Sequence, residues 1–411
     1  MQKYKFTLPF TLRVINTIGA GLRAMRLPIA DFKEETLLRA ASKQTGLSDF
    51  GDPYFREGLR CLLDSAEQDA QLHFLGRMVF YNWILLQLTN RLLLVETTQR
   101  RPEVFERPLL PPIIVLGIPR SGTTLLHRML ALDPTHRGVP VWEVNRPIPT
   151  IGGSPDRRRQ TAEKEINLRS KFTANIDHKH YSGLDDPEEC LFMLGLTFVN
   201  TAFWLFADVY GYIDWYMKQN LFEKKYQDYF RLLQVLQSAN PDRRLVMKAP
   251  EHSPKVDVLL EIIPSALIIQ THRDPVAVVP SLNSLYYSIH ISLADQVDMI
   301  RMAETNLHLL EWEIEENRTA RKKCTGQILD IQYEQIVADP VGTVIEVYRH
   351  FQLPWPNGFE YTLQAYIEQN PKDKHGRHHY RPEDFGQTSQ EIAEKFKEYN
   401  EEFGYAKGVE S

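Results

Sequence analysis

Hydrophobic positions recur at helical spacing through the first hundred residues. In "EETLLRAASKQTGL" and in the long stretch from 54 to 96, apolar residues return every three or four positions, a period typical of helices that bury one face. The proline-rich "RPLLPP" at 107–112 interrupts this period. The pattern therefore predicts an all-helical N-terminal region over residues 1–105.

The pattern changes after residue 106. Short apolar runs adjoin helical segments in "PPIIVLG", "RRLVMKAP", "SALIIQTH" and "GQILDIQYEQI". Strands that are apolar on both faces and alternate with helices predict a parallel sheet covered by helices on both sides. We expect an α/β domain over 106–411. A helical, aromatic-rich insert at 140–240 is expected to line the substrate site, because such inserts lie at the carboxyl ends of parallel strands.

Composition restricts the classes of partner. The chain of 411 residues is 43% hydrophobic and 25% charged and has a net charge of −5, as is typical of a globular protein. The chain has no overall positive charge, so we expect no nucleic-acid partner, and any anion site should be local. The cysteines lack metal-ligand spacing, which favours reduced packing residues and no metal site; they are Cys61, Cys190 and Cys324.

Apolar segments that resemble membrane segments are short or interrupted by charge. Basic residues break the N-terminal apolar stretch and argue against a secretory signal; they are Arg13, Arg23 and Arg26. The run at 78–88 is about half a bilayer span and is bracketed by Arg77 and Arg91, so we expect a buried helix. The predicted location is cytoplasmic, and peripheral contact of residues 1–30 with a membrane is a secondary hypothesis.

A glycine-framed loop follows the first predicted strand. In "GIPRSGTT", four residues separate Gly117 from Gly122, and a helix is expected near Thr123. The glycines let the backbone close around an anion, and the helix start offers free N–H groups. Thr123 stands where ATP-binding loops have a lysine, and Arg120 lies inside the loop. The loop predicts an anion site with three hydroxyl donors, Ser121, Thr123 and Thr124.

A second anion site is predicted in "LIIQTHRDPVAVVPSL". The strand is expected to end at Thr271, with Asp274 and Pro275 as the N-cap and first residue of the next helix. Arg273 at the strand end is suited to bidentate binding of a phosphate. Ser281 follows two turns along the helix.

Together the two sites describe a nucleotide with phosphates at both its 5′ and 3′ positions. At these motifs the chain resembles the sulfotransferases that use 3′-phosphoadenosine-5′-phosphosulfate (PAPS), in their bacterial and tyrosylprotein branches. "PRSGTT" resembles the 5′-phosphosulfate loop, and "THRDPVAVVPS" resembles the 3′-phosphate motif, with Arg273 and Ser281 at the matching positions. "MKAPEHSPKV" and "YEQIVADP" resemble further segments. The resemblance covers residues 110–400 and implies a P-loop-like fold, PAPS as donor and no requirement for a metal.

The resemblance also implies roles for single residues. Arg120 would bridge the 5′-phosphate and the leaving oxygen, and Lys248 would reach the sulfate. Tyr333 would contact the adenosine, and Arg377, in the cluster "KHGRHHYRPEDFG", would close over the 3′-phosphate. The residues expected to hold the 5′ end are Arg120, Ser121, Gly122, Thr123 and Thr124.

Two residues compete for the general base that a hydroxyl acceptor requires. Glu143, in "VPVWEVNRP", lies close to the position of a glutamate in the tyrosylprotein branch. His180, in "HKHYSGLDDPEECLF", resembles a histidine of related bacterial sequences, and its ordinary pKa lies nearer neutrality. We rank Glu143 slightly ahead and retain both, with His252 as a third candidate.

The preferred prediction is a sulfotransferase that moves a sulfuryl group from PAPS to a hydroxyl of a hydrophobic small-molecule or lipid acceptor. The products would be a sulfate ester and adenosine 3′,5′-bisphosphate. Thr123 in place of lysine disfavours a P-loop kinase or NTPase. The joint presence of Arg120, Lys248, Arg273 and Ser281 disfavours a degenerate nucleotide-binding scaffold. A homodimer is a further hypothesis.

Overall fold

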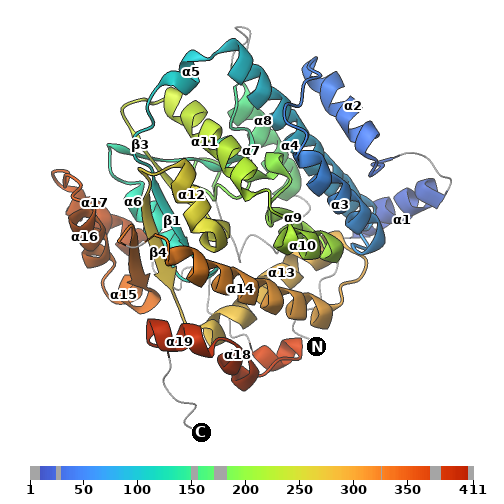
Figure 1. Ribbon diagram of the computed structural model, residues 1–411. Helices are drawn as coiled ribbons and strands as arrows, with labels where there is room; N and C mark the ends of the chain where they lie inside the picture. The colour runs from blue at the N-terminus through green and yellow to red at the C-terminus, as the bar shows by residue number, and fades with distance from the viewer. Residues whose placement is uncertain are drawn as a thin grey trace.

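The computed structural model describes residues 10–24, 29–149, 156–170, 183–324, 326–370 and 381–405. The described part of the region before residue 106 is helical, as the period of its apolar residues predicts. Its helices are α1 (Phe10–Ala24), α2 (Glu34–Thr45), α3 (Phe55–Gln68), α4 (Phe74–Arg100) and α5 (Glu103–Glu106). Helices α1 and α2 pack against α4 on the right side of Figure 1, whereas α5 lies at the upper left, against α11 (Phe222–Ser238).

The strands that follow form one parallel sheet. They are β1 (Ile113–Gly117), β2 (His136–Gly138), β3 (Arg244–Lys248), β4 (Leu267–His272) and β5 (Ile328–Gln332). Their order in the sheet is β2-β3-β1-β4-β5, and each neighbouring pair is parallel. This confirms the predicted parallel sheet, with β1 at the point where the chain turns from one side of the sheet to the other. Ligands of such sheets bind outside the carboxyl ends of the strands at this point.

Alternate residues of the strands enter two different cores. Ile114 and Leu116 of β1 pack into a large core with α11 (Phe222–Ser238) and α12 (Val256–Ile262). Ile113 and Val115 pack into a second core with α6 (Thr123–Leu130) and α16 (Pro340–His350). Because successive strand side chains point to opposite faces, a strand buried on both sides has to be apolar throughout. All five residues of β1 are buried, as this requires.

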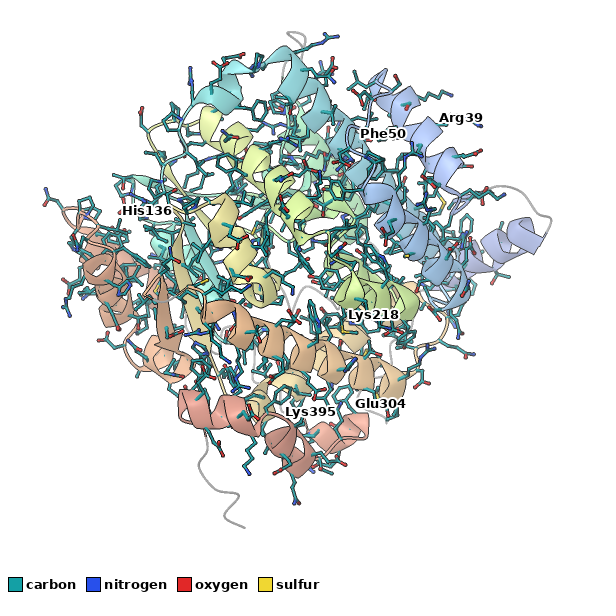
Figure 2. All side chains as sticks on the ribbon, in the orientation of Figure 1. Arg39, Phe50, His136, Lys218, Glu304 and Lys395 are labelled. Atoms are coloured by element: carbon teal, nitrogen blue, oxygen red, sulfur yellow. The ribbon has the colours of Figure 1, made fainter. Side chains whose placement is uncertain are left out.

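Helices cover both faces of the sheet (Figure 1). After β1 come α6 (Thr123–Leu130), α7 (Val141–Asn145) and α8 (Arg158–Ser170). The aromatic-rich segment forms η2 (Met193–Thr197), α9 (Ala202–Phe206), α10 (Tyr210–Lys218) and α11 (Phe222–Ser238). Then follow η3 (Pro250–Lys255), α12 (Val256–Ile262), α13 (Pro275–Leu293) and α14 (Met299–Arg321). The chain closes with α15 (Tyr333–Ala338), α16 (Pro340–His350), α17 (Phe359–Gln369), η4 (Pro382–Phe385), α18 (Ser389–Lys395) and α19 (Lys397–Phe403). Side chains fill the spaces between these layers (Figure 2).

Helix α4 contains the apolar run at 78–88 and is longer than that run. Among the described helices it is the one long and apolar enough to cross a membrane, by length and composition. Half of its most apolar window is nevertheless buried inside the protein. Arg77 and Arg91 are also buried, at 6% and 2% exposure, with protein partners. The contacts of these arginines support the predicted packing of α4 against other helices.

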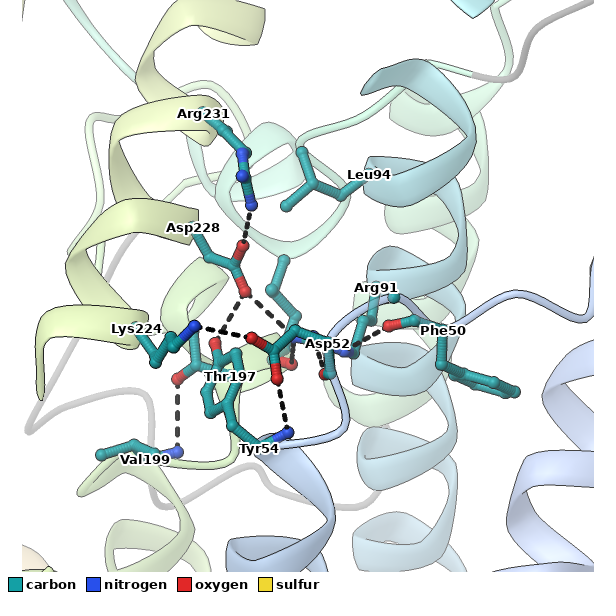
Figure 3. A network of polar contacts seen from close by, with 12 residues as sticks. Phe50, Asp52, Tyr54, Arg91, Leu94, Thr197, Val199, Lys224, Asp228 and Arg231 are labelled. Carbon is teal, nitrogen blue, oxygen red and sulfur yellow. Dashed lines mark hydrogen bonds and ion pairs between the residues drawn. The ribbon is translucent and has the colours of Figure 1, made fainter. Parts of the chain in front are cut away.

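Arg91 joins the N-terminal helices to the aromatic segment (Figure 3). Its guanidinium donates to Asp228 Oδ2 on α11 at 3.0 Å and to the carbonyls of Phe50 and Asp52 at 2.8 Å each. Tyr54 donates its hydroxyl proton to the same Asp228 oxygen at 2.6 Å. The carboxylate and the guanidinium are 7% and 3% exposed, so each neutralises a charge that would otherwise be buried alone.

We expect Asp228→Ala to lower the free energy of unfolding by about 3–5 kcal/mol, because it leaves the Arg91 charge buried and unpaired. Urea unfolding measures the change. The matched control is Lys224→Ala, which removes an ion pair to Asp52 that is about half exposed and should cost at most about 1 kcal/mol. Equal losses in the two variants would contradict this account of the network.

Candidate functional site

Four predicted motifs meet at the carboxyl edge of the sheet. The register pairs Val115 of β1 with Lys248 of β3, and Gly117 with Thr271 of β4. The glycine-framed loop, Lys248 and Arg273 therefore leave the sheet side by side, and Tyr333 follows the end of β5 next to β4. The parallel sheet explains how segments up to about 200 residues apart in sequence form one site.

Glycine is required at both ends of the loop. Gly117 has φ +131°, and a Cβ there would lie 2.2 Å from the carbonyl oxygen of Thr271. Gly122 has φ +88°, and a Cβ there would lie 3.2 Å from the ring of Tyr333. Arg120 also has a positive φ, +65°, a conformation that non-glycine residues rarely adopt outside constrained functional loops.

The loop is closed from inside by hydroxyl groups. Ser121 Oγ donates to the carbonyl of Ile118 at 2.6 Å and lies 2.5 Å from Thr271 Oγ1, and the Ser121 residue is fully buried. The Gly117 N–H donates to Ser253 Oγ at 2.9 Å. Since the Ser121 hydroxyl is bonded within the protein, the group it offers a ligand is its backbone N–H.

Helix α6 directs its start at the centre of the loop. Its N-cap is Gly122, and its first backbone hydrogen bond runs from Leu126 N to Gly122 O. The N–H groups before Leu126 have no partner within the helix, by helix geometry. Together with the helix dipole they suit the binding of an anion, and the predicted anion site stays a prediction.

The second predicted anion site adjoins the first. Arg120 Nε donates to Ser281 Oγ at 3.2 Å, and Arg273 Nη1 donates to the Arg120 carbonyl at 2.7 Å. The Arg273 guanidinium also lies 3.9 Å from the centre of the Tyr333 ring, a cation–π distance. Asp274 caps α13 by accepting from Val276 N, which confirms the predicted cap. Direct contacts thus link two arginines, a serine and a tyrosine into one cluster.

Lys248 lies between the loop helix and a carboxylate. Its Nζ donates to Thr124 Oγ1 at 3.3 Å and pairs with Glu189. The lysine is 1% exposed, whereas the Glu189 side chain is 17% exposed. The Glu189 segment lies against the end of β3 because the Cys190 N–H donates to the Lys248 carbonyl at 3.0 Å. Glu189 is thus the carboxylate beside the predicted lysine, and it is not among the residues singled out from the sequence.

Glu143 has a different partner. Its carboxylate pairs with Arg137 on the edge strand β2, and the Glu143 residue is 2% exposed. Burial raises the pKa of Glu143, and the charge of Arg137 opposes that rise. The carboxylate is therefore held by a buried ion pair at β2, two strands away from β1.

His180 and Arg377 lie outside the described residues. His252 is fully buried, with its ring nitrogens 3.2 Å from Cys190 Sγ and 3.4 Å from the Tyr226 hydroxyl. Burial lowers the pKa of His252 to about 3. A neutral imidazole with two interior contacts is a packing element in this structure.

Comparison with known proteins agrees with this geometry. A family model described as "Sulfotransferase family" matches residues 111–357. The chain belongs to the sulfotransferase family. A curated relative from Mycobacterium tuberculosis, omega-hydroxy-beta-dihydromenaquinone-9 sulfotransferase Stf3, is 26% identical over 269 residues, and the same protein of Mycobacterium bovis matches equally. The match covers 59% of this chain and 63% of the length of each relative.

Solved sulfotransferase structures share most of the fold. STF1 from Mycobacterium tuberculosis is 27% identical, with a TM-score of 0.74 over 89% of this chain and 98% of its own. STF9 from Mycobacterium avium is 25% identical, with a TM-score of 0.82 over 90% of this chain and 96% of its own. About a tenth of the chain lies outside these two structural matches. That tenth is shorter than the predicted N-terminal region of 105 residues, so it cannot contain the whole region. Part of the N-terminal helical region therefore belongs to the shared fold.

Proposed function

We propose that this chain transfers a sulfuryl group from PAPS to a hydroxyl group of a hydrophobic acceptor. One observation carries the proposal: Lys248 Nζ lies between Thr124 at the anion-binding start of α6 and the Glu189 carboxylate. A cation thus separates the place suited to a phosphosulfate from a group able to accept a proton. Sulfuryl transfer needs both, because negative charge grows on the leaving oxygen while the acceptor hydroxyl loses its proton.

The residues present fit the donor nucleotide. The N–H groups at the start of α6 and the Arg120 guanidinium suit the 5′-phosphosulfate. Arg273 and Ser281 suit the 3′-phosphate, since both lie against Arg120. This assignment accounts for two adjoining anion sites with a single ligand.

The proposed reaction is a direct displacement at sulfur. The acceptor oxygen forms a new S–O bond while the bond from sulfur to the 5′-phosphate oxygen breaks. Glu189 accepts the proton of the acceptor hydroxyl, and Lys248 and Arg120 stabilise the charge on the leaving phosphate oxygen. We favour Glu189 over Glu143 as the base because Glu189 pairs with Lys248, whereas Glu143 pairs with Arg137.

Aromatic side chains near Glu189 support a hydrophobic acceptor. Phe192 follows Glu189 by three positions, and its ring centre lies 6.2 Å from that of Phe206. The Phe206 ring in turn lies 4.8 Å from the Trp83 ring on α4. All three are half-buried and retain exposed apolar surface. The curated relative Stf3 is named for a lipid-like acceptor, an omega-hydroxy-beta-dihydromenaquinone-9, which also favours a lipid alcohol here.

Nucleotide binding tests the donor assignment. Titration calorimetry with adenosine 3′,5′-bisphosphate and with ATP·Mg²⁺ compares the two nucleotide classes. We expect the bisphosphate to bind and ATP·Mg²⁺ to bind far more weakly, because Thr123 replaces the lysine of ATP-binding loops. Binding of ATP·Mg²⁺ alone would overturn the proposal.

Arg273→Ala should weaken binding of adenosine 3′,5′-bisphosphate by about 10- to 100-fold, the effect of losing hydrogen bonds to a charged group. Binding of adenosine 5′-monophosphate, which lacks the 3′-phosphate, should weaken much less. Calorimetry on both nucleotides measures the difference. An equal loss for both would show that Arg273 does not bind the 3′-phosphate.

A further inference from the structure

Helix α14 carries a largely buried carboxyl, Glu313, that has no hydrogen-bond partner among the described residues. Its inner face presents Asn306, Glu313 and Asn317. Asn306 accepts from Trp204 Nε1 at 2.8 Å and donates to Asn283 at 3.0 Å. Asn317 donates to the Ser253 carbonyl at 2.7 Å. Glu313 is 9% exposed, and among the described residues it makes no hydrogen bond or ion pair.

The lysine whose charge acts on Glu313 is already paired with another carboxylate. Lys225 pairs with Glu251 at 2.5 Å, and both residues are buried. Glu251 also accepts from Asn200 Nδ2 at 2.8 Å, from Thr201 N at 3.2 Å and from the Tyr216 hydroxyl at 3.3 Å. Burial and the charge of Glu251 raise the pKa of Glu313 to about 8. Glu313 is therefore mostly a neutral carboxylic acid near pH 7, with a proton to donate.

Tyr286 on the neighbouring helix α13 also lacks a hydrogen-bond partner among the described residues. Its ring packs near Trp204 and His290, at 6.2 and 5.8 Å between centres, and the residue is half-buried. Its hydroxyl has no hydrogen bond within the described part of the chain. Its pKa is raised by burial and by the charges of Glu313, Glu189 and Glu251. Helix α13 packs against both α14 and α9. Helix α9 carries Phe206, whose ring lies 6.2 Å from that of Phe192, three positions after the proposed base Glu189.

A carboxyl and a hydroxyl that lack hydrogen-bond partners in a largely apolar environment are costly unless a ligand satisfies them. We propose that Tyr286 and Glu313 bind a second, neutral oxygen group of the acceptor, a carbonyl or hydroxyl, close to the hydroxyl that receives the sulfuryl group. Tyr286 and Glu313 are then specificity-determining residues. This inference rests on the proposed function, since it assigns these residues to the same acceptor.

Matched acceptors test the assignment. The probes are a long-chain primary alcohol, alcohols of the same length with a ketone at successive positions along the chain, and the corresponding amino alcohols. We expect one ketone alcohol to exceed the plain alcohol in kcat/KM. The preference is the kcat/KM of that ketone alcohol divided by the kcat/KM of the plain alcohol. Tyr286→Phe and Glu313→Met should each lower this ratio by about tenfold. Glu313→Gln should retain most of it, because an amide still donates a hydrogen bond.

Glu304→Gln, on the exposed side of the same helix and labelled in Figure 2, is the matched control. The inference is overturned if the ratio is the same in the wild type, Tyr286→Phe and Glu313→Met, or if the amino alcohols are preferred.

Calorimetric binding of the plain and ketone alcohols to the bisphosphate complex separates this inference from the proposed function. If no acceptor is sulfated but the ketone alcohol binds more tightly and loses that preference in both variants, the subsite stands and the proposed reaction fails. If the wild type has no ketone preference in binding or turnover, the subsite fails.

Discussion

Glu189→Gln is expected to lower kcat by about 10²- to 10⁴-fold, the usual contribution of a general base. The amide keeps the shape of the side chain and loses its ability to accept a proton. Binding of adenosine 3′,5′-bisphosphate should change little, because the nucleotide is assigned to α6, Arg120 and Arg273. Steady-state kinetics with a long-chain alcohol, together with calorimetry, measure the two effects separately.

Glu143→Gln is the comparison that decides between the two carboxylates. It breaks a buried ion pair with Arg137, so we expect a loss of stability in urea that exceeds its effect on kcat. His180→Ala in parallel tests the remaining alternative. A large loss of kcat in Glu143→Gln or His180→Ala, with Glu189→Gln active, would remove Glu189 from the role of base.

Lys248→Met should lower kcat by about 10²- to 10³-fold, because the leaving oxygen loses a preorganised cation in a buried site. Methionine retains much of the volume of the lysine stem, so the core beside β3 stays filled. Lys248 and Glu189 form an ion pair, so the effects of their substitutions on kcat should not be independent. In the double variant Lys248→Met/Glu189→Gln, we expect a loss well below the product of the single losses.

Strictly multiplicative losses would contradict the pairing of Lys248 with Glu189 during the reaction. Urea unfolding of each variant separates this result from a general loss of structure. Lys255→Met is a suitable control, since Lys255 also follows β3 but pairs with Glu316 on α14.

The strands and the loop could be predicted from the sequence because their causes are local. A strand buried on both faces must be apolar throughout, as "IIVLG" and "LIIQTH" are. The positive φ of Gly117 and Gly122 requires glycine, so the frame of the loop is visible in the sequence. The parallel arrangement then brings Lys248, Arg273 and Tyr333 to one edge, which motif spacing and resemblance anticipated.

Glu189 could not be selected from the sequence because its position depends on contacts between distant segments. The hydrogen bond from Cys190 N to the Lys248 carbonyl places Glu189 beside Lys248, and nothing local distinguishes Glu189 from the acidic residues around it. The signal that was available is its place in "DPEEC", the segment that helped to single out His180.

The burial of Glu313 could not be predicted from the sequence for a related reason. Helix α14 carries several acidic residues in "EWEIEENR", and their exposure is decided by the packing of α14 against η3 and α13. A sequence pattern gives the period of a helix, whereas the depth of one polar side chain depends on what covers it.

Transfer of radiolabelled sulfate from PAPS tests the central claim most directly. The wild-type chain is incubated with labelled PAPS and a panel of long-chain alcohols, and labelled ester and adenosine 3′,5′-bisphosphate are quantified together. We predict equal amounts of ester and bisphosphate with the wild type and little of either with Glu189→Gln. Tight binding of the bisphosphate without labelled product from any alcohol, or label transferred only to glycans, would contradict the proposed reaction or its acceptor class.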